Sequence, residues 1–242
     1  MNDAFIRAVK TTDTDDSVYP FSIPAIKAIE SIQFSASVTF FVGENGSGKS
    51  TLTESVAVAA GFNAEGGTKN YSFTTQDTTS SLTDKITLVR GSRREKYGYF
   101  LRAESFYTTA NYAESGTFDY SGPSPILFEG KHIHEQSHGE AFLSIVKTFR
   151  PGLFIFDEPE SALSPQRQLA LLVAMKELVK QGSQFIIATH SPILLAYPDA
   201  KIYQLSQSGI EQVDYENIEH VKLTKDFLNN PKGYLDRLMG EL

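Results

Sequence analysis

The sequence predicts an α/β domain built around a mostly parallel β-sheet. Short, mostly apolar runs at 38–42, 153–156 and 184–190 are typical of strands that are buried in the sheet. Helical patterns follow the first two runs, and residues suited to ligand chemistry follow each run. Those residues are a glycine loop, a pair of carboxylates and a histidine. In open α/β sheets, ligands bind at the carboxyl ends of the strands.

Composition limits the possible classes of protein. The chain has 242 residues, enough for one large domain or for a domain with a small insertion. Its 40% hydrophobic and 21% charged residues are typical of a soluble globular protein, and its formal charge of −7 does not favour general attraction to nucleic acid or anionic membranes. The dense basic run at Arg90, Arg93, Arg94 and Lys96 indicates a solvated turn between two strands rather than a nucleic-acid contact.

Cysteine and targeting signals are absent from the sequence. The lack of cysteine excludes disulfides, thiolate metal sites and cysteine nucleophiles, and it suits a reducing cytosol. The acidic N-terminal segment has no apolar core of a signal peptide. No apolar run approaches the roughly 20 residues needed to span a bilayer. We therefore expect a soluble, cytoplasmic protein without direct membrane insertion.

The run VTFFV at 38–42 leads into GENGSGKST and then into a helical pattern that ends near Gly61. The pattern G-x-x-x-x-G-K-[ST] is met here, between a strand and a helix, as a phosphate-binding loop requires. Glycines let backbone N–H groups point at phosphate, the lysine adds a cation, and the serine hydroxyl suits Mg²⁺. The expected phosphate-binding residues are Gly43, Glu44, Asn45, Gly46, Ser47, Gly48, Lys49, Ser50 and Thr51, with Ser50 also at the metal.

The sequence LFIFDEPE at 153–160 predicts a central strand that ends at two carboxylates. Asp157 is placed to hold the Mg²⁺ shell, and Glu158 is placed to act as general base toward an attacking water. A helix is predicted over 165–180, with proline at its start and apolar residues at mostly helical spacing. The strand QFIIATH at 184–190 then places His190 at a third strand end.

Three segments carry a resemblance to a known family. GENGSGKS, FIFDEPESALS and IIATHSP, in that order, resemble the phosphate loop, the Walker B strand with D-loop, and the H-loop of ABC-type ATPases. The chain is most similar to stand-alone soluble members near the head domains of chromosome-maintenance and recombination-repair ATPases, over roughly 20–200. The resemblance implies one domain over 1–242, with an antiparallel N-terminal sheet, a small inserted lobe at about 105–140, and a C-terminal strand pair and helices at 201–242.

The resemblance also implies a role for the histidine-rich stretch KHIHEQSHGE. In this family a signature of the form S-G-G-Q precedes Walker B and binds the γ-phosphate of ATP held by another subunit. Ser137, His138, Gly139 and Glu140 hold that position, with His138 and Glu140 as departures from the pattern. A metal site made with His132, His134 and His138 is disfavoured, because His138 is expected at the start of a helix. Only Glu135 or Glu140 could then complete a tetrahedron.

Two family features remain open between alternatives. The family's Mg²⁺-contacting glutamine matches either Glu104, which we favour, or Gln76. The adenine-stacking aromatic is either Tyr19 or Phe21, unless that residue simply packs on the core. The D-loop departs from the family pattern by ending in Ser164.

The predicted function is Mg²⁺-dependent binding and hydrolysis of ATP, with Glu158 and His190 as catalytic residues and Ser50, Asp157 and Glu104 at the metal. The resemblance implies an ATP-driven homodimer that acts as a switch on a soluble protein or on nucleic acid. One alternative is the nucleotide-binding subunit of a transporter, although the insert is short. Another is a slow regulatory ATPase that clamps an effector such as a nuclease.

Overall fold

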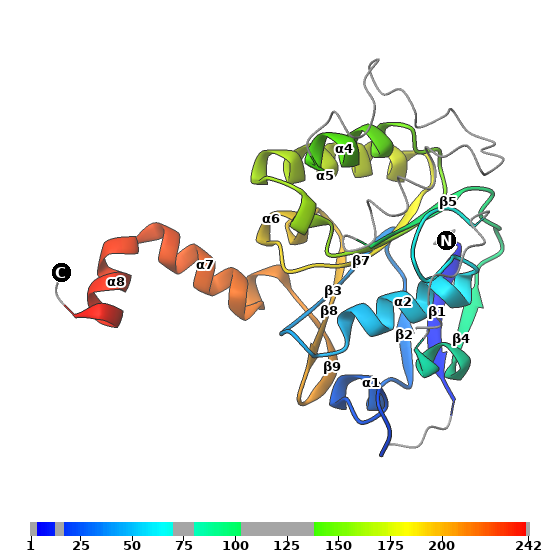
Figure 1. The fold of residues 1–242 in the computed structure, drawn as a ribbon, viewed down its shortest axis with the longest axis horizontal. Helices are drawn as coiled ribbons and strands as arrows, with labels where there is room; N and C mark the ends of the chain where they lie inside the picture. Colours follow the sequence, from blue (N-terminus) through cyan, green and yellow to red (C-terminus); the bar gives the residue numbers. More distant parts are fainter. Residues whose placement is uncertain (1–3, 13–16, 70–79, 103–137, 241–242) are drawn as a thin grey trace.

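The computed structural model describes residues 4–12, 17–69, 80–102 and 138–240, and it confirms the α/β architecture (Figure 1). The strands are β1 (Ile6–Thr11), β2 (Ser31–Gln33), β3 (Val38–Gly43), β4 (Ile86–Arg90), β5 (Gly98–Arg102), β6 (Leu153–Asp157), β7 (Gln184–Ala188), β8 (Lys201–Ser206) and β9 (Gly209–Val213). The α-helices are α1 (Pro24–Lys27), α2 (Lys49–Ala60), α4 (His138–Lys147), α5 (Pro165–Lys180), α6 (Pro192–Leu195), α7 (Glu219–Asn229) and α8 (Pro231–Met239). Short 3-10 turns lie at Ser81–Lys85, Pro159–Ala162 and Tyr215–Asn217.

Within these ranges the main sheet has six strands in the order β5-β6-β7-β3-β8-β9. The pairs from β5 to β8 are parallel, and only β9 runs antiparallel, to β8. The strand β7 therefore lies between β3, which precedes the glycine loop, and β6, which ends at the paired carboxylates. Because parallel strands end at the same edge, this order brings the three predicted site segments together.

Helices cover both faces of the main sheet (Figure 1). On one face, α4, α5 and α6 pack over an apolar core that includes Phe40 of β3. On the other face, α2 and the N-terminal sheet enclose a second core that includes the next residue, Phe41. Both phenylalanines are fully buried, which confirms that β3 is covered on both sides. This two-sided burial is why the strand reads as an unbroken apolar run.

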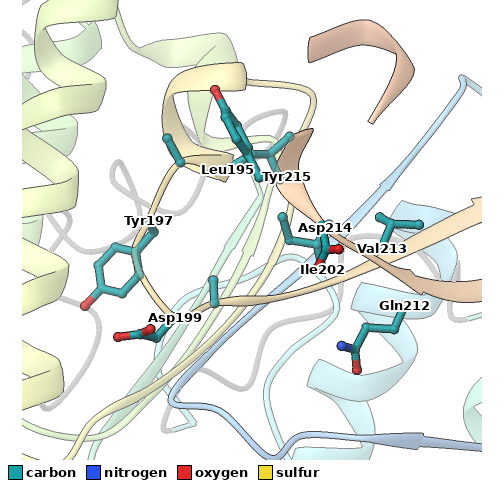
Figure 2. Close-up of a pocket in the computed structure, with 10 residues that line it drawn as sticks. Leu195, Tyr197, Asp199, Ile202, Gln212, Val213, Asp214 and Tyr215 are labelled. Carbon is teal, nitrogen blue, oxygen red and sulfur yellow. The ribbon is translucent and has the colours of Figure 1, made fainter. Parts of the chain in front are cut away.

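The C-terminal segment forms the predicted hairpin β8–β9, followed by α7 and α8, which extend away from the sheet (Figure 1). A cavity of about 290 Å³ lies between this hairpin and α6 (Figure 2). Tyr215 lines the cavity, and its hydroxyl donates a hydrogen bond to the carbonyl of Pro192 at 3.1 Å. The hydrogen bond ties the segment that leads into α7 to the start of α6.

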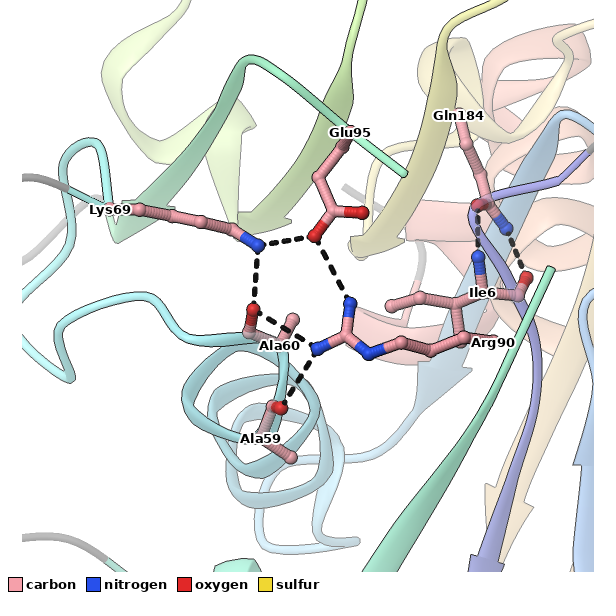
Figure 3. A network of polar contacts seen from close by, with 7 residues as sticks. All are labelled: Ile6, Ala59, Ala60, Lys69, Arg90, Glu95 and Gln184. Atoms are coloured by element: carbon pink, nitrogen blue, oxygen red, sulfur yellow. Dashed lines mark hydrogen bonds and ion pairs between the residues drawn. The ribbon is translucent and has the colours of Figure 1, made fainter. Parts of the chain in front are cut away.

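The N-terminal sheet is antiparallel, in the order β2-β1-β4, as the family resemblance implied. Figure 3 shows how it joins the main sheet. The buried side chain of Gln184, at the start of β7, accepts from the backbone N–H of Ile6 at 3.0 Å and donates to the Ile6 carbonyl at 2.8 Å. One amide side chain thus satisfies both backbone groups of Ile6, at a point where the two sheets meet.

The basic run lies between β4 and β5, as predicted for a turn between strands. Arg93 places its guanidinium 5.0 Å from the ring centroid of Phe5. Arg90 and Lys69 both pair with the carboxylate of Glu95 and also donate to carbonyls at the C-terminal end of α2 (Figure 3). These contacts hold α2 against the turn, so this part of the run serves packing.

The other predicted elements match closely. The helix predicted over 165–180 is α5, Pro165–Lys180, and the helix predicted to end near Gly61 is capped there by Gly61 in the left-handed conformation. The strand predicted over 184–190 ends at Ala188, two residues before His190. The inserted lobe predicted at 105–140 lies outside the described residues except at 138–140, where α4 begins. Among the described helices, none has the length and hydrophobicity needed to cross a membrane.

Candidate functional site

The candidate site lies at the carboxyl edge of three adjacent strands, β3, β7 and β6. Their register aligns Phe41 of β3 and Asp157 of β6 with Ala188 of β7. Backbone hydrogen bonds continue past the strand ends, from the Thr189 N–H to Phe41 at 3.1 Å and from the Glu158 N–H to Ala188 at 2.9 Å. The loops after the three strands therefore start side by side. The sequence patterns predicted each loop, and the sheet order brings them together.

The glycine loop adopts the geometry that its glycines allow. Gly43, Gly46 and Gly48 all have positive φ, at 153°, 80° and 96°. A Cβ on Gly43 would lie 2.3 Å from the carbonyl oxygen of Leu205 on β8, so this position has no room for a side chain. Gly48 is the residue before α2 and has no side chain to cap the helix. The backbone N–H groups of the first turn therefore remain available to a phosphate.

Lys49 is the central cation of the site. Its side chain folds back over the loop, and Nζ donates to the carbonyls of Gly43 and Glu44, both at 2.9 Å. The residue is only 4% exposed. Burial lowers the pKa of the Lys49 ammonium, and the carboxylates of the segment 157–160 oppose that shift. The loop thus holds the lysine ammonium against its own backbone carbonyls.

Asp157 and Glu158 follow one another at the end of β6 but have different environments. Asp157, the last residue of the strand, is 8% exposed, whereas the side chain of Glu158 is 42% exposed. Glu158 has a left-handed backbone, with φ 49° and ψ 52°, which is unusual for a residue with a side chain. Both carboxylates act on the Lys49 ammonium, Glu158 more strongly than Asp157. The buried carboxylate of Asp157 suits a metal ligand, and the exposed carboxylate of Glu158 suits a general base.

His190 faces Glu158 across the edge of the sheet, with its Nε2 3.7 Å from Oε1 of that glutamate. Burial and the nearby Lys49 ammonium lower the pKa of the His190 imidazole, while the Glu158 carboxylate opposes the shift. The backbone N–H of His190 donates to the carboxylate of Glu160. Burial raises the pKa of this carboxyl group, and the hydrogen bond from His190 acts in the opposite direction. Glu160 therefore fixes the loop that carries the histidine.

His220 is a member of this cluster that the sequence patterns did not indicate. It lies in the first turn of α7, and its ring centroid is 6.3 Å from that of His190. Burial lowers the pKa of His220, as do His190 and Lys49. Within the part of the chain that the structure describes, the buried Nε2 atoms of both histidines form no hydrogen bond. The prediction of a strand pair and helices at 201–242 does not place His220 beside His190.

The two aromatic candidates have opposite environments. Phe21 is 6% exposed and packs in the core beneath α2. Tyr19 is 66% exposed, and its hydroxyl lies 3.3 Å from the Thr51 hydroxyl at the start of α2. Of the two, Tyr19 has the accessible ring beside the phosphate loop, so it is the one able to stack on a base.

The signature segment is described only from the first residue of α4. Gly139 and Glu140 lie in the first turn of α4, next to Arg167 of α5. Arg167 pairs with Glu140 at 3.1 Å and packs against Gly139 so closely that a Cβ there would lie 2.7 Å from its guanidinium. The described residues exclude Ser137, the side chain of His138, Glu104, Gln76, His132 and His134.

With this geometry in view, comparison with known proteins identifies the family. Residues 23–156, more than half of the chain, match the family described as "AAA domain". Residues 140–196 match "AAA domain, putative AbiEii toxin, Type IV TA system". The first match contains the phosphate loop and ends within β6, one residue before Asp157, and the second contains the paired carboxylates and His190.

Two curated relatives are ATP-binding proteins by name. An "uncharacterized ABC transporter ATP-binding protein" of Haemophilus influenzae is 31% identical over 107 residues, which is 42% of this chain and 41% of the relative. A "putative ABC transporter ATP-binding protein" of Streptomyces avermitilis is 28% identical over 185 residues, 71% of this chain and 32% of the relative. The matches thus span less than half the length of either relative.

Solved structures were compared with the fold, and one of the two named here has a TM-score above 0.5. A part of the ABC transporter complex cbiONQ from Clostridium perfringens covers 97% of this chain and 99% of its own, with 15% identity and a TM-score of 0.52. The SMC head domain from Thermotoga maritima covers 86% of this chain and 99% of its own, with 16% identity and a TM-score of 0.48. At this identity the first likeness shows the fold alone. The chain therefore has the ABC ATPase fold and belongs to the AAA-domain family of P-loop ATPases.

Proposed function

We propose that this protein binds ATP with Mg²⁺ and hydrolyses its terminal phosphate. The observation that carries the proposal is the convergence of Lys49, Glu158 and His190 at one edge of the sheet. The Nε2 atom of His190 lies 3.7 Å from the Glu158 carboxylate. Lys49 is close enough to His190 to lower the pKa of its imidazole. A cation, a general base and a polar group beside a phosphate loop are the parts that phosphoryl transfer to water requires.

Each residue then has a defined task. Lys49 exchanges its two carbonyl partners for the β- and γ-phosphates, a role supported by its position over the loop. Tyr19 stacks on the adenine. Glu158 orients and deprotonates the attacking water, and His190 holds the γ-phosphate in line with it. The different exposures of the Asp157 and Glu158 side chains support a division of labour in which Asp157 binds metal and Glu158 acts as base.

The residues present fit a magnesium ion. Asp157 offers a buried carboxylate within reach of the charge on Lys49, and Ser50 offers a hydroxyl in the first turn of α2. These are hard oxygen ligands of the type that Mg²⁺ prefers. Glu104, which lies outside the described residues, is proposed as a further ligand. When bound, Mg²⁺ neutralises charge on the phosphates.

The proposal includes an ATP-driven homodimer. Residues 137–140 act on the ATP of the second protomer through the N-terminus of α4, where backbone N–H groups favour an anion. The same two patches meet twice, which gives twofold symmetry. Such a dimer switches a soluble protein partner or nucleic acid, and hydrolysis releases it.

The names of the two relatives favour a second candidate, the nucleotide-binding subunit of a transporter. A membrane protein that co-purifies with this chain would support that alternative. Turnover stimulated by DNA would support the soluble switch. Stable ATP-bound dimers with negligible turnover, despite an intact Glu158, would point instead to a regulatory module that clamps an effector.

The first test is the solution mass of the Glu158→Gln protein, measured by light scattering with and without Mg-ATP. The substitution removes the base and keeps the shape of the side chain, so ATP should stay bound. We expect a shift from monomer to dimer on adding Mg-ATP, and no shift with Mg-ADP. The exposed residue Glu177 on α5 gives a matched control, because Glu177→Gln changes the same charge away from the site. A monomer that binds ATP without shifting would contradict the homodimer.

A further inference from the structure

The first turn of α5 contacts both halves of the proposed site. It follows the D-loop, and the Ser164 hydroxyl accepts from the backbone N–H of Arg167 at its start. Arg167 and Gln168 are adjacent in sequence, so their side chains leave the helix about 100° apart. Arg167 points toward α4, which lies beside α5 in Figure 1, and Gln168 points toward the interior.

Gln168 is 8% exposed and uses both ends of its amide. Its Nε2 donates to the carbonyl of Leu163 in the D-loop at 3.0 Å, and its Oε1 accepts from the hydroxyl of Ser191. That hydroxyl also accepts from two backbone N–H groups in the first turn of α6, at 3.1 Å each. Ser191 directly follows His190, so Gln168 fixes the loop that carries this histidine.

Arg167, unlike the buried Gln168, makes a partly exposed contact with α4. Its guanidinium pairs with Glu140 at 3.1 Å and lies against Gly139, at the end of α4 assigned to the second protomer's ATP. The side chains of Arg167 and Glu140 are 31% and 56% exposed. Ion pairs with this exposure contribute little to stability, so an incoming triphosphate can compete with Glu140 for the guanidinium.

We propose that the first turn of α5 couples the two half-sites, with Arg167 responding to nucleotide at α4 and Gln168 positioning His190. Both act as positioning residues. The proposal rests on the function proposed above, because it needs a second protomer to supply the nucleotide at α4. When the Arg167 guanidinium changes partner, the first turn of α5 shifts. The buried amide of Gln168 then transmits this shift through Ser191 to His190.

The test uses steady-state ATP hydrolysis by the full chain, with kcat, KM and the Hill coefficient measured over a range of ATP concentrations. We expect Gln168→Ala to lower kcat at least fivefold while KM stays within twofold. We expect Arg167→Ala to bring the Hill coefficient to 1, and Arg167→Lys to restore part of the cooperativity. Gln166→Ala, at an exposed position on the same turn, is the matched control and should change neither.

A double mutant decides between coupling and independent effects. If the two residues act in one path, Arg167→Ala should also lower kcat, and its combination with Gln168→Ala should lower kcat no further than the stronger single change does. Losses that multiply would overturn the proposal. So would a Gln168→Ala protein that melts earlier but keeps its kcat, because this would show a purely structural role. Gln168→Met keeps the volume and should behave like Gln168→Ala if the hydrogen bonds matter.

A second readout separates this inference from the proposed function. Amide hydrogen exchange over 188–195 should be faster in Gln168→Ala than in wild type or in Gln166→Ala, with no ATP present. A wild-type chain that neither hydrolyses ATP nor dimerises would overturn both the proposed function and the coupling. Faster exchange in that case would still establish that Gln168 holds the His190 loop, and unchanged exchange would overturn that part as well.

Discussion

The phosphate loop and the His190 loop are neighbours at one sheet edge, but they are held in different ways. The phosphate loop is held mainly by its own residues, since Lys49 bonds to carbonyls five and six positions away. The His190 loop is held by distant side chains, with Glu160 30 positions away and Gln168 23 positions from Ser191. The comparison teaches that a loop held by its own residues can be recognised from a short sequence motif. A loop supported from elsewhere needs the fold before its supports can be identified.

The largest expected effect comes from the centre of the phosphate loop. Lys49→Ala removes the cation that would contact the phosphates, so we expect ATP affinity to fall at least 100-fold, or about 2.7 kcal/mol. A fluorescent ATP analogue would measure this. Lys176→Ala, at an exposed position on α5, controls for the loss of one positive charge. Unchanged affinity in Lys49→Ala would remove this lysine from the proposed site.

Substitutions at two glycines test whether β8 constrains the phosphate loop. Gly43 and Gly46 both have positive φ, but only at Gly43 would a Cβ meet another segment, at 2.3 Å from the Leu205 carbonyl oxygen. We expect Gly46→Ala to lower the free energy of unfolding by about 1–2 kcal/mol through backbone strain alone. Gly43→Ala should cost about 3 kcal/mol or more. Equal losses in a denaturant titration would show that β8 does not constrain the loop.

Glu160 tests the supports of the His190 loop. Glu160→Ala leaves the backbone N–H of His190 without its partner, so we expect unfolding to become easier by about 1–3 kcal/mol and kcat to fall roughly tenfold. Glu160→Gln keeps an oxygen acceptor and should retain most of both. Denaturant unfolding and steady-state turnover would measure the pair. A Glu160→Gln protein as impaired as Glu160→Ala would mean that charge, rather than the hydrogen bond, matters here.

The smallest effect is the pH dependence that His220 adds. Its folded pKa lies below the usual value of 6.5, so between those two values the unfolded chain binds more protons than the folded one. The free energy of unfolding is therefore unaffected above about pH 7 and falls as pH drops through 6.5. His220→Gln should weaken this fall, as followed by Tm from pH 7.5 to 5.5. His190, whose pKa is also lowered, and Glu160, whose pKa is raised and which acts with the opposite sign, are present in both proteins. The difference therefore reports His220 together with its coupling to His190.

The sequence predicted the helices and strands that depend on the order of neighbouring residues. Apolar runs buried on both faces predicted β3, β6 and β7, and proline at a helix start together with helical spacing predicted α5 to the residue. It could not predict that His220 lies beside His190, because that contact depends on how α7 leaves the β8–β9 hairpin. The burial of the Gln168 side chain depends on the packing of α5 against α6, which the predicted helix over 165–180 does not specify.

The left-handed backbone of Glu158 has a consequence for how this chain could change over time. A side chain in that conformation raises the energy of the folded state by roughly 1–2 kcal/mol, and glycine or asparagine would relieve part of that strain. The residue proposed as the base is thus one whose loss would make the protein more stable. A descendant no longer selected for turnover would be expected to lose Glu158 early, and it would gain thermal tolerance as it did so.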